Sequence, residues 1–80
     1  METLQTPSSS SISSIDYDKA SLQMRITFTS GDRYVYYGVP YAVFRGFETS
    51  PSKGRYFQKY VRNRFRFRKS LSLQRKLIVL

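Results

Sequence analysis

The residues best suited to chemistry in this sequence form one run, from Ser52 to Lys69, in which basic and aromatic side chains are interleaved and acidic ones are absent. Lys and Arg neutralise phosphates, while Tyr and Phe rings and Arg planes stack on unpaired bases. The run therefore predicts a nucleic-acid partner, with RNA favoured over DNA. Its candidate phosphate contacts are Lys53, Arg55, Lys59, Arg62, Arg64, Arg66 and Arg68.

Aromatic residues are the second part of this prediction. The chain has seven Tyr and six Phe, so many that some of the rings must form the core of so small a protein. Tyr34 and Tyr36 fall on one face of a predicted strand, as expected either for core packing or for a base-stacking platform. Tyr56 and Phe65, which lie inside the basic run, are further candidates for stacking.

Charge is unevenly placed along the chain. The formal net charge is +9, and no Asp or Glu follows Glu48. A run of like charges is commonly just a solvated face, but the lack of compensating acids favours a binding role for this one. An acidic protein surface is the alternative to a nucleic acid as its partner.

No catalytic residue, metal ligand or cofactor is predicted. The sequence has no His, no Cys and only five carboxylates, so the usual acid, base, nucleophile and zinc-ligand groups are missing. We therefore expect a protein that is not an enzyme. The lack of Cys, of an apolar run of about 20 residues and of a signal peptide favours a cytoplasmic protein without a membrane segment.

Hydrophobic patterning predicts three strands, over residues 12–17, 22–29 and 33–37. The pattern is clearest in residues 22–29, where apolar side chains hold every even position, the alternation of a strand with one buried face. Turn residues separate the three segments. They are therefore expected to form a three-stranded antiparallel meander.

Two short helices are predicted after the meander. Pro40 is suited to start a helix over residues 40–48, and Ser50 or Ser52 to cap a second helix. Both helices carry an apolar stripe that would cover one face of the sheet. The predicted fold is thus α+β, ending in a basic extended segment with Arg62, Arg64, Arg66 and Arg68 along one side.

The two ends of the chain differ from its middle. Residues 1–11 form a Ser-rich arm that is expected to be disordered alone, and residues 70–80 form an amphiphilic arm with an apolar end. The domain itself is assigned to residues 12–69. The arms raise a second hypothesis, in which the chain is a structural or adaptor subunit of a larger assembly, such as a phage virion, and docks on protein partners through them. The oligomeric state is left open.

Four motifs resemble those of the KTSC domain family. The most specific are Tyr34–Pro40 (YVYYGVP) and Ser52–Phe57 (SKGRYF), preceded by Ser10–Ile12 and Ile15–Asp18. The KTSC domain is a module found at the C-terminus of some lysyl-tRNA synthetases and in small bacterial and phage proteins. Its attachment to a tRNA-charging enzyme implies RNA binding by association, which fold alone does not confer.

The resemblance covers roughly Ser10 to Lys69. The chain departs from the family pattern at Asp16, where Gly is common, and in carrying the two terminal arms. The arms put in doubt whether it acts as a free module.

Overall fold

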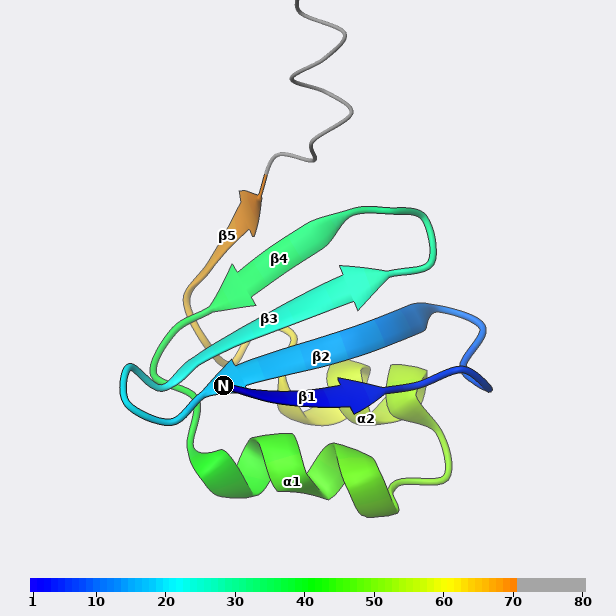
Figure 1. Cartoon of the computed structure of the whole chain (residues 1–80), viewed down its shortest axis with the longest axis horizontal. Helices are drawn as coiled ribbons and strands as arrows, with labels where there is room; N and C mark the ends of the chain where they lie inside the picture. The colour runs from blue at the N-terminus through cyan, green and yellow to red at the C-terminus, as the bar shows by residue number, and fades with distance from the viewer. Residues whose placement is uncertain (71–80) are drawn as a thin grey trace, which may run out of the picture.

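The computed structural model describes residues 1–70 of the chain. Figure 1 shows a single sheet with both helices on one side of it. The elements follow in the order β1 (Glu2–Gln5), β2 (Ile12–Asp18), β3 (Gln23–Phe28), β4 (Arg33–Tyr36), α1 (Tyr41–Thr49), α2 (Lys53–Tyr60) and β5 (Phe67–Ser70). The α+β class predicted from the sequence is correct.

The sheet has five strands rather than three. They are antiparallel throughout and lie in the order β1-β2-β3-β4-β5, which is also their order in the chain. The predicted three-stranded meander is therefore wrong as a description of the sheet. It corresponds to β2, β3 and β4, and one edge strand is added on each side.

Strand β1 lies in the segment that was predicted to be a disordered arm. Leu4 of β1 pairs with Ile15 of β2 and packs against the core. Pairing with β2 satisfies backbone groups of residues 2–5 and gives Leu4 a buried surface, and these gains outweigh the polar composition that favoured disorder. The Ser-rich arm thus begins as part of the sheet.

Strand β5 forms the opposite edge and is shorter than the predicted extended segment. Residues 61–64 form a turn, in which Asn63 has a φ of 63°. Asn tolerates this left-handed conformation better than most residues, and the turn reverses the chain after α2. As a result Arg62 and Arg64 lie in the turn, and they do not form one row with Arg66 and Arg68.

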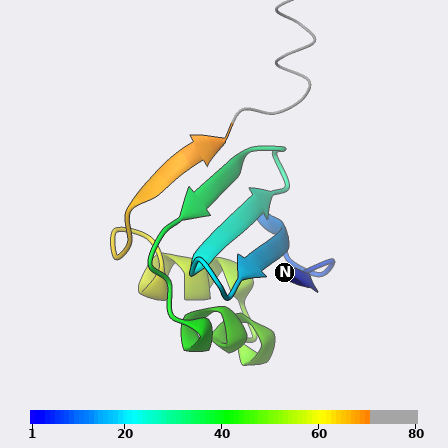
Figure 2. The same cartoon turned by 60° about the vertical axis from the view of Figure 1, so that its left-hand side comes forward.

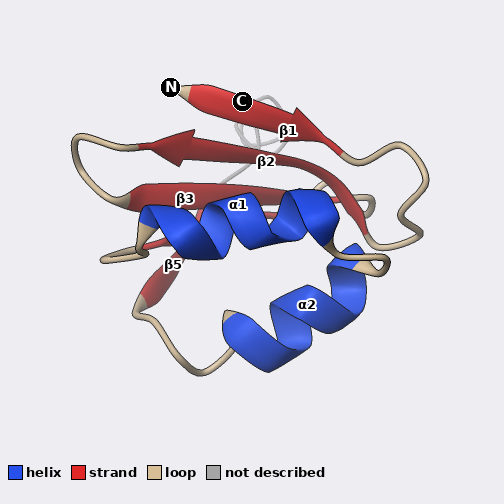
Figure 3. Cartoon of the chain, turned by 90° about the horizontal axis from the view of Figure 1, so that it is seen from below, coloured by secondary structure: helices blue, strands red, loops and turns tan. Residues whose placement is uncertain are grey.

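The core lies between the helices and the sheet face that they cover (Figure 3). Tyr17 of β2 shows how the layers are joined: its ring stacks on Phe44 of α1 at 5.0 Å between centroids, and its hydroxyl donates to the carbonyl oxygen of Val39 at 2.6 Å. The buried apolar residues are Ile12, Ile15, Tyr17, Met24, Ile26, Tyr36, Val39, Phe44, Phe47, Phe57 and Val61.

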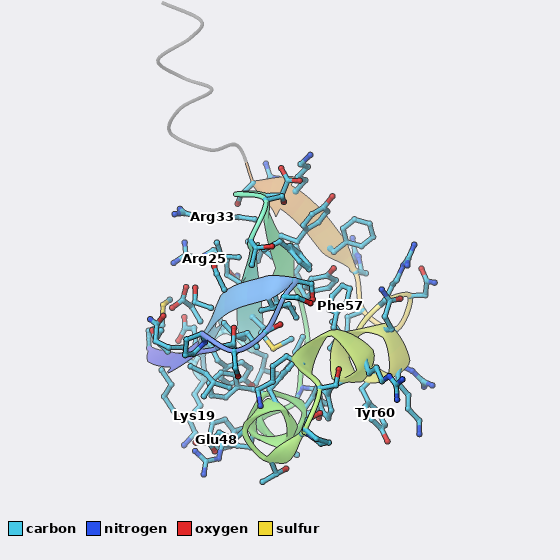
Figure 4. The ribbon with its side chains drawn as sticks, turned by 90° about the vertical axis from the view of Figure 1, so that its right-hand side faces the viewer. Lys19, Arg25, Arg33, Glu48, Phe57 and Tyr60 are labelled. Atoms are coloured by element: carbon cyan, nitrogen blue, oxygen red, sulfur yellow. The ribbon has the colours of Figure 1, made fainter. Side chains whose placement is uncertain are left out.

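Helix α2 begins after one of the two predicted caps, Ser50 and Ser52. Ser52 is the N-cap residue, and its hydroxyl oxygen accepts a hydrogen bond from the backbone N–H of Arg55 at 3.3 Å. Phe57 points from α2 toward the sheet in Figure 4, whereas Tyr60 points away from it. The helix therefore has one face in the core and one in solvent.

The other face of the sheet is not covered by either helix (Figure 2). Arg68 of β5, Val35 of β4 and Arg25 of β3 lie side by side on this face, because antiparallel partners share a side of the sheet. Residues 71–80, which include most of the predicted C-terminal arm, lie outside the described residues. Neither helix in the described part of the chain has the length and apolar character needed to cross a membrane.

One buried hydroxyl gives a test of how β1 is held. Thr6, which is 3% exposed, donates a hydrogen bond to the carbonyl oxygen of Ile12. We expect Thr6→Val to lower the free energy of unfolding by about 1–3 kcal/mol, since the carbonyl loses a buried partner. Urea denaturation measures this change. Thr3→Val, at an exposed hydroxyl within β1, is the control and should cost less; equal costs would contradict a special role for Thr6.

Candidate nucleic-acid interface

The seven predicted cations come from three parts of the structure. Lys53, Arg55 and Lys59 lie on α2, Arg62 and Arg64 lie in the turn after it, and Arg66 and Arg68 lie at or in β5. Lys53 is half-buried, and its ammonium group donates to the carbonyl oxygen of Ser50 at 2.7 Å. The other six are exposed.

Few of the cations are neutralised within the protein. Among residues 1–70, the salt bridges are Arg25 with Asp16, Arg45 with Glu48, and Lys69 with Asp32. None of the seven predicted cations has a carboxylate partner in this part of the chain. The positive charge at the end of α2 and at β5 is therefore available to an external anion.

Arg55, Lys59 and Arg62 project from the solvent side of α2 and from the turn that follows it. Arg55 and Lys59, at i and i+4, share one face of α2, Arg62 follows in the turn, and Figure 4 shows nitrogen-tipped side chains extending from this region. Arg62 donates to the side-chain oxygen of Gln58 at 3.0 Å, and Arg64 to the backbone carbonyl of Lys59 at 3.0 Å. We call Arg55, Lys59 and Arg62 the cationic ridge.

Arg66 and Arg68 lie apart from the cationic ridge. Along β5 the side chains alternate, so Arg68 shares the uncovered sheet face with Val35, whereas Phe67 faces the helix side. Arg66 accepts a hydrogen bond at its carbonyl from the N–H of Tyr37 at 2.9 Å, which extends the β4–β5 pairing. The structure therefore divides the predicted cations between two faces.

The three predicted tyrosines occupy different environments. Tyr56 packs against Phe47 at 4.5 Å between ring centroids and donates its hydroxyl to the carbonyl oxygen of Val43 at 2.8 Å, so it joins the two helices. Tyr36 is 4% exposed and Tyr34 is half-buried. Tyr34 and Tyr36 line the same open cavity.

That cavity, which we call the aromatic pocket, opens between α2 and the β4–β5 edge of the sheet. It has a volume of about 340 Å³, near the lower end of the range for small-molecule sites, about 300–1,000 Å³. Its wall and floor are mostly aromatic. The lining residues are Phe28, Tyr34, Tyr36, Phe57, Arg62, Asn63 and Phe67.

Polar and charged groups surround the aromatic pocket. Arg62 and Asn63 line it on the side of the turn. On the sheet side, Lys69 lies beside Tyr34, with its Nζ 5.9 Å from the ring centroid, and forms its 3.5 Å salt bridge with Asp32. The pocket thus combines exposed ring surface with a cation on two sides.

Burial raises the pKa of Tyr36 in the aromatic pocket. Desolvation, together with the neighbouring Tyr34, raises the pKa of Tyr36 to about 12, and the charge of Arg62 acts in the opposite direction. Tyr36 is therefore a neutral hydrogen-bonding group at physiological pH.

Sequence reasoning missed part of this pocket. Phe28, Phe57 and Phe67 were not among the candidate site residues, and neither was Asn63. Phe67 carried a usable signal, because its alternation with Arg66 and Arg68 places it on the opposite side of a strand. The approach of Phe28 to Phe57, at 5.4 Å between ring centroids, depends on the packing of α2 on the sheet and has no local signal.

Comparison with known proteins identifies relatives along most of the chain. The chain is 34% identical over 64 residues to a lysine–tRNA ligase of Nostoc punctiforme, a match that covers 80% of this chain and 11% of the ligase. The chain thus spans only about a tenth of that curated relative. A protein of Tsukamurella paurometabola is 38% identical over 63 residues, which cover 79% of this chain and 94% of that protein.

Structure and sequence comparisons point to the same family. The crystal structure of a KTSC domain protein from Yersinia pestis has a TM-score of 0.81 and 34% identity, with 88% of this chain and 97% of that chain covered. Residues 8–65 match the KTSC domain family. The chain therefore belongs to the KTSC domain family.

Proposed function

We propose that this chain is a non-catalytic domain that binds nucleic acid, RNA in preference to DNA, through the cationic ridge and the aromatic pocket beside it. The observation that carries the proposal is the position of Arg62, which belongs to the ridge and also lines the pocket. A strand whose phosphates follow the ridge would bring its bases to exposed aromatic rings. Phosphate neutralisation and base stacking together are the usual basis of single-strand binding.

The relatives support RNA as the nucleic acid. Lysine–tRNA ligases carry a segment similar to this chain, and their name gives tRNA as a substrate of the whole enzyme. A basic, aromatic module attached to such an enzyme is suited to hold RNA. This support is by association, so the proposal rests mainly on the ridge and the pocket.

The salt dependence of binding tests this proposal. We expect the affinity for a labelled single-stranded RNA to fall steeply with salt, and the triple variant Arg55→Gln, Lys59→Gln, Arg62→Gln to bind more weakly. Removing three phosphate contacts should make the slope of log affinity against log salt shallower by about 2, since each contact to a single strand contributes about 0.7. Fluorescence anisotropy across a salt series measures both quantities.

A matched variant separates the ridge from overall charge. Lys19→Gln, Arg33→Gln, Arg45→Gln also removes three positive charges, but Figure 4 places Lys19 and Arg33 away from the side of α2 that bears Tyr60. It should retain most of the salt slope. If both triple variants lost the same affinity and salt slope, net charge alone would explain the effect of the ridge variant. No RNA binding by the parent protein would overturn the proposal and favour a protein partner, as in an adaptor subunit.

A further inference from the structure

We infer that the aromatic pocket holds one unpaired nucleobase, so that the domain selects single-stranded over duplex RNA. The inference rests on the proposed function and assigns a specific role to the pocket within it. It is drawn from the arrangement of the rings, the chemistry of the pocket rim and the size of the cavity.

Five aromatic rings form a closed circuit around the pocket. The consecutive centroid distances are 5.7 Å from Phe28 to Tyr34, 5.8 Å from Tyr34 to Phe67, 5.7 Å from Phe67 to Tyr36, 5.8 Å from Tyr36 to Phe57, and 5.4 Å from Phe57 to Phe28. Because each ring is held by two others, the pocket is fixed before a ligand arrives. Little conformational entropy is then lost on binding.

The rings differ in exposure in the way that a stacking site requires. Tyr36 and Phe57 are 4% and 8% exposed and belong to the core, whereas Phe67 is 55% exposed at the edge of the sheet. Phe67 lies on the same side of the sheet as Tyr36, because the two pair across β4 and β5. An inserted base would therefore meet the free surface of Phe67 at the mouth of the pocket and the core rings at its floor.

The rim favours a nucleobase over an apolar side chain. Arg62 and Asn63 bring exposed hydrogen-bonding groups to the pocket, and an aliphatic or Phe side chain would offer them no partner. A base offers polar edges to these groups and flat faces to the rings. The phosphates on either side of it would lie near Arg62 and Lys69, which flank the pocket.

Asn63 is the group best placed to contact the edge of the base. Its amide has both donors and an acceptor, and its left-handed backbone, with a φ of 63°, belongs to the turn that forms the pocket's side. We therefore expect it to set a base preference. Gly adopts the same conformation without a side chain, so Asn63→Gly removes the amide and preserves the turn.

The experiment compares an RNA oligonucleotide with an abasic strand of equal length and charge, using the full chain. The parent protein should bind the base-containing strand about tenfold more tightly, since one stacked base contributes a factor of that order. Phe67→Ala should bind both strands equally, and Phe67→Trp should restore the difference. Tyr60→Ala, which removes a ring that is 43% exposed on α2 outside the pocket, should retain it.

The outcomes distinguish this inference from the proposed function. Equal binding of both strands by the parent, with a steep salt slope, would overturn the base site and leave the nucleic-acid interface standing. Failure to bind either strand would overturn both. The site would be supported if Phe67→Ala bound the two strands equally while its circular dichroism spectrum remained that of the folded domain. A weaker preference among RNA homopolymers in Asn63→Gly would support it as well.

Discussion

Gly46→Ala should destabilise this domain by about 3 kcal/mol, although Ala is the better helix former by about 1 kcal/mol. A Cβ at Gly46 of α1 would lie 2.6 Å from Cζ and 2.9 Å from Cε2 of Tyr56, and closer still to its hydroxyl. The ring would have to move away. It would then lose its hydrogen bond to the carbonyl oxygen of Val43 and its packing on Phe47.

The measurement is urea denaturation of the single and double variants. In a Tyr56→Ala background the clash is absent, so Gly46→Ala should become neutral or stabilising, giving a large coupling energy between the two positions. Gly54→Ala is the matched control in α2. Its Cβ would meet only the Ser11 hydroxyl, at 2.9 Å, which can rotate. A stable Gly46→Ala variant would contradict the close approach of the two helices.

Stability should fall steeply between pH 10 and pH 12, with Tyr36 as a main contributor. Burial raises the pKa of Tyr36 from 10.0 to about 12. The unfolded chain therefore loses this proton at lower pH than the folded chain, and the contribution to stability is complete below pH 10 and lost as pH rises through 12. A difference of two pKa units corresponds to about 3 kcal/mol.

Chemical denaturation at a series of pH values, with tyrosinate absorbance followed in parallel, measures this effect. Tyr36→Phe should show a flatter decline, and the remaining slope should reflect residues such as Tyr17, whose pKa burial also raises. Tyr60→Phe, at an exposed ring, should change the profile less than Tyr36→Phe does. A Tyr36→Phe profile that coincided with the parent's would show that Tyr36 ionises as readily in the folded domain as in the unfolded chain.

Local patterns in the sequence determined the elements that form the centre of the fold. Alternation over residues 22–29 predicted β3 with one buried face, because side chains alternate across a strand. Pro40 predicted the start of α1 to within one residue, since it is the N-cap residue and not the first residue of the helix. Ser50 and Ser52 were the predicted alternatives for the cap of α2, and the cap is Ser52. The motifs of residues 34–40 and 52–57 led to the family that the comparisons show.

Only the tertiary structure decided the edges of the sheet. The polar segment of residues 2–5 becomes β1 because β2 offers partners for its backbone groups and a partly buried position for Leu4. Neither can be inferred from composition. Likewise, the turn at Asn63 divides the basic run, so that Arg62 and Arg64 do not lie in the row that alternation predicted. Pairing between distant segments, rather than local propensity, sets both edges.

The candidate site shows the same division. The sequence determined that cations and aromatic rings are concentrated after Ser52 without acids among them. The anionic partner with flat faces that this pattern favours stays a prediction. The sequence did not determine which rings are free. Tyr56 is held between the helices and Phe67 lies open in the pocket, because exposure depends on what packs against each ring, and that is decided by contacts between elements far apart in the chain.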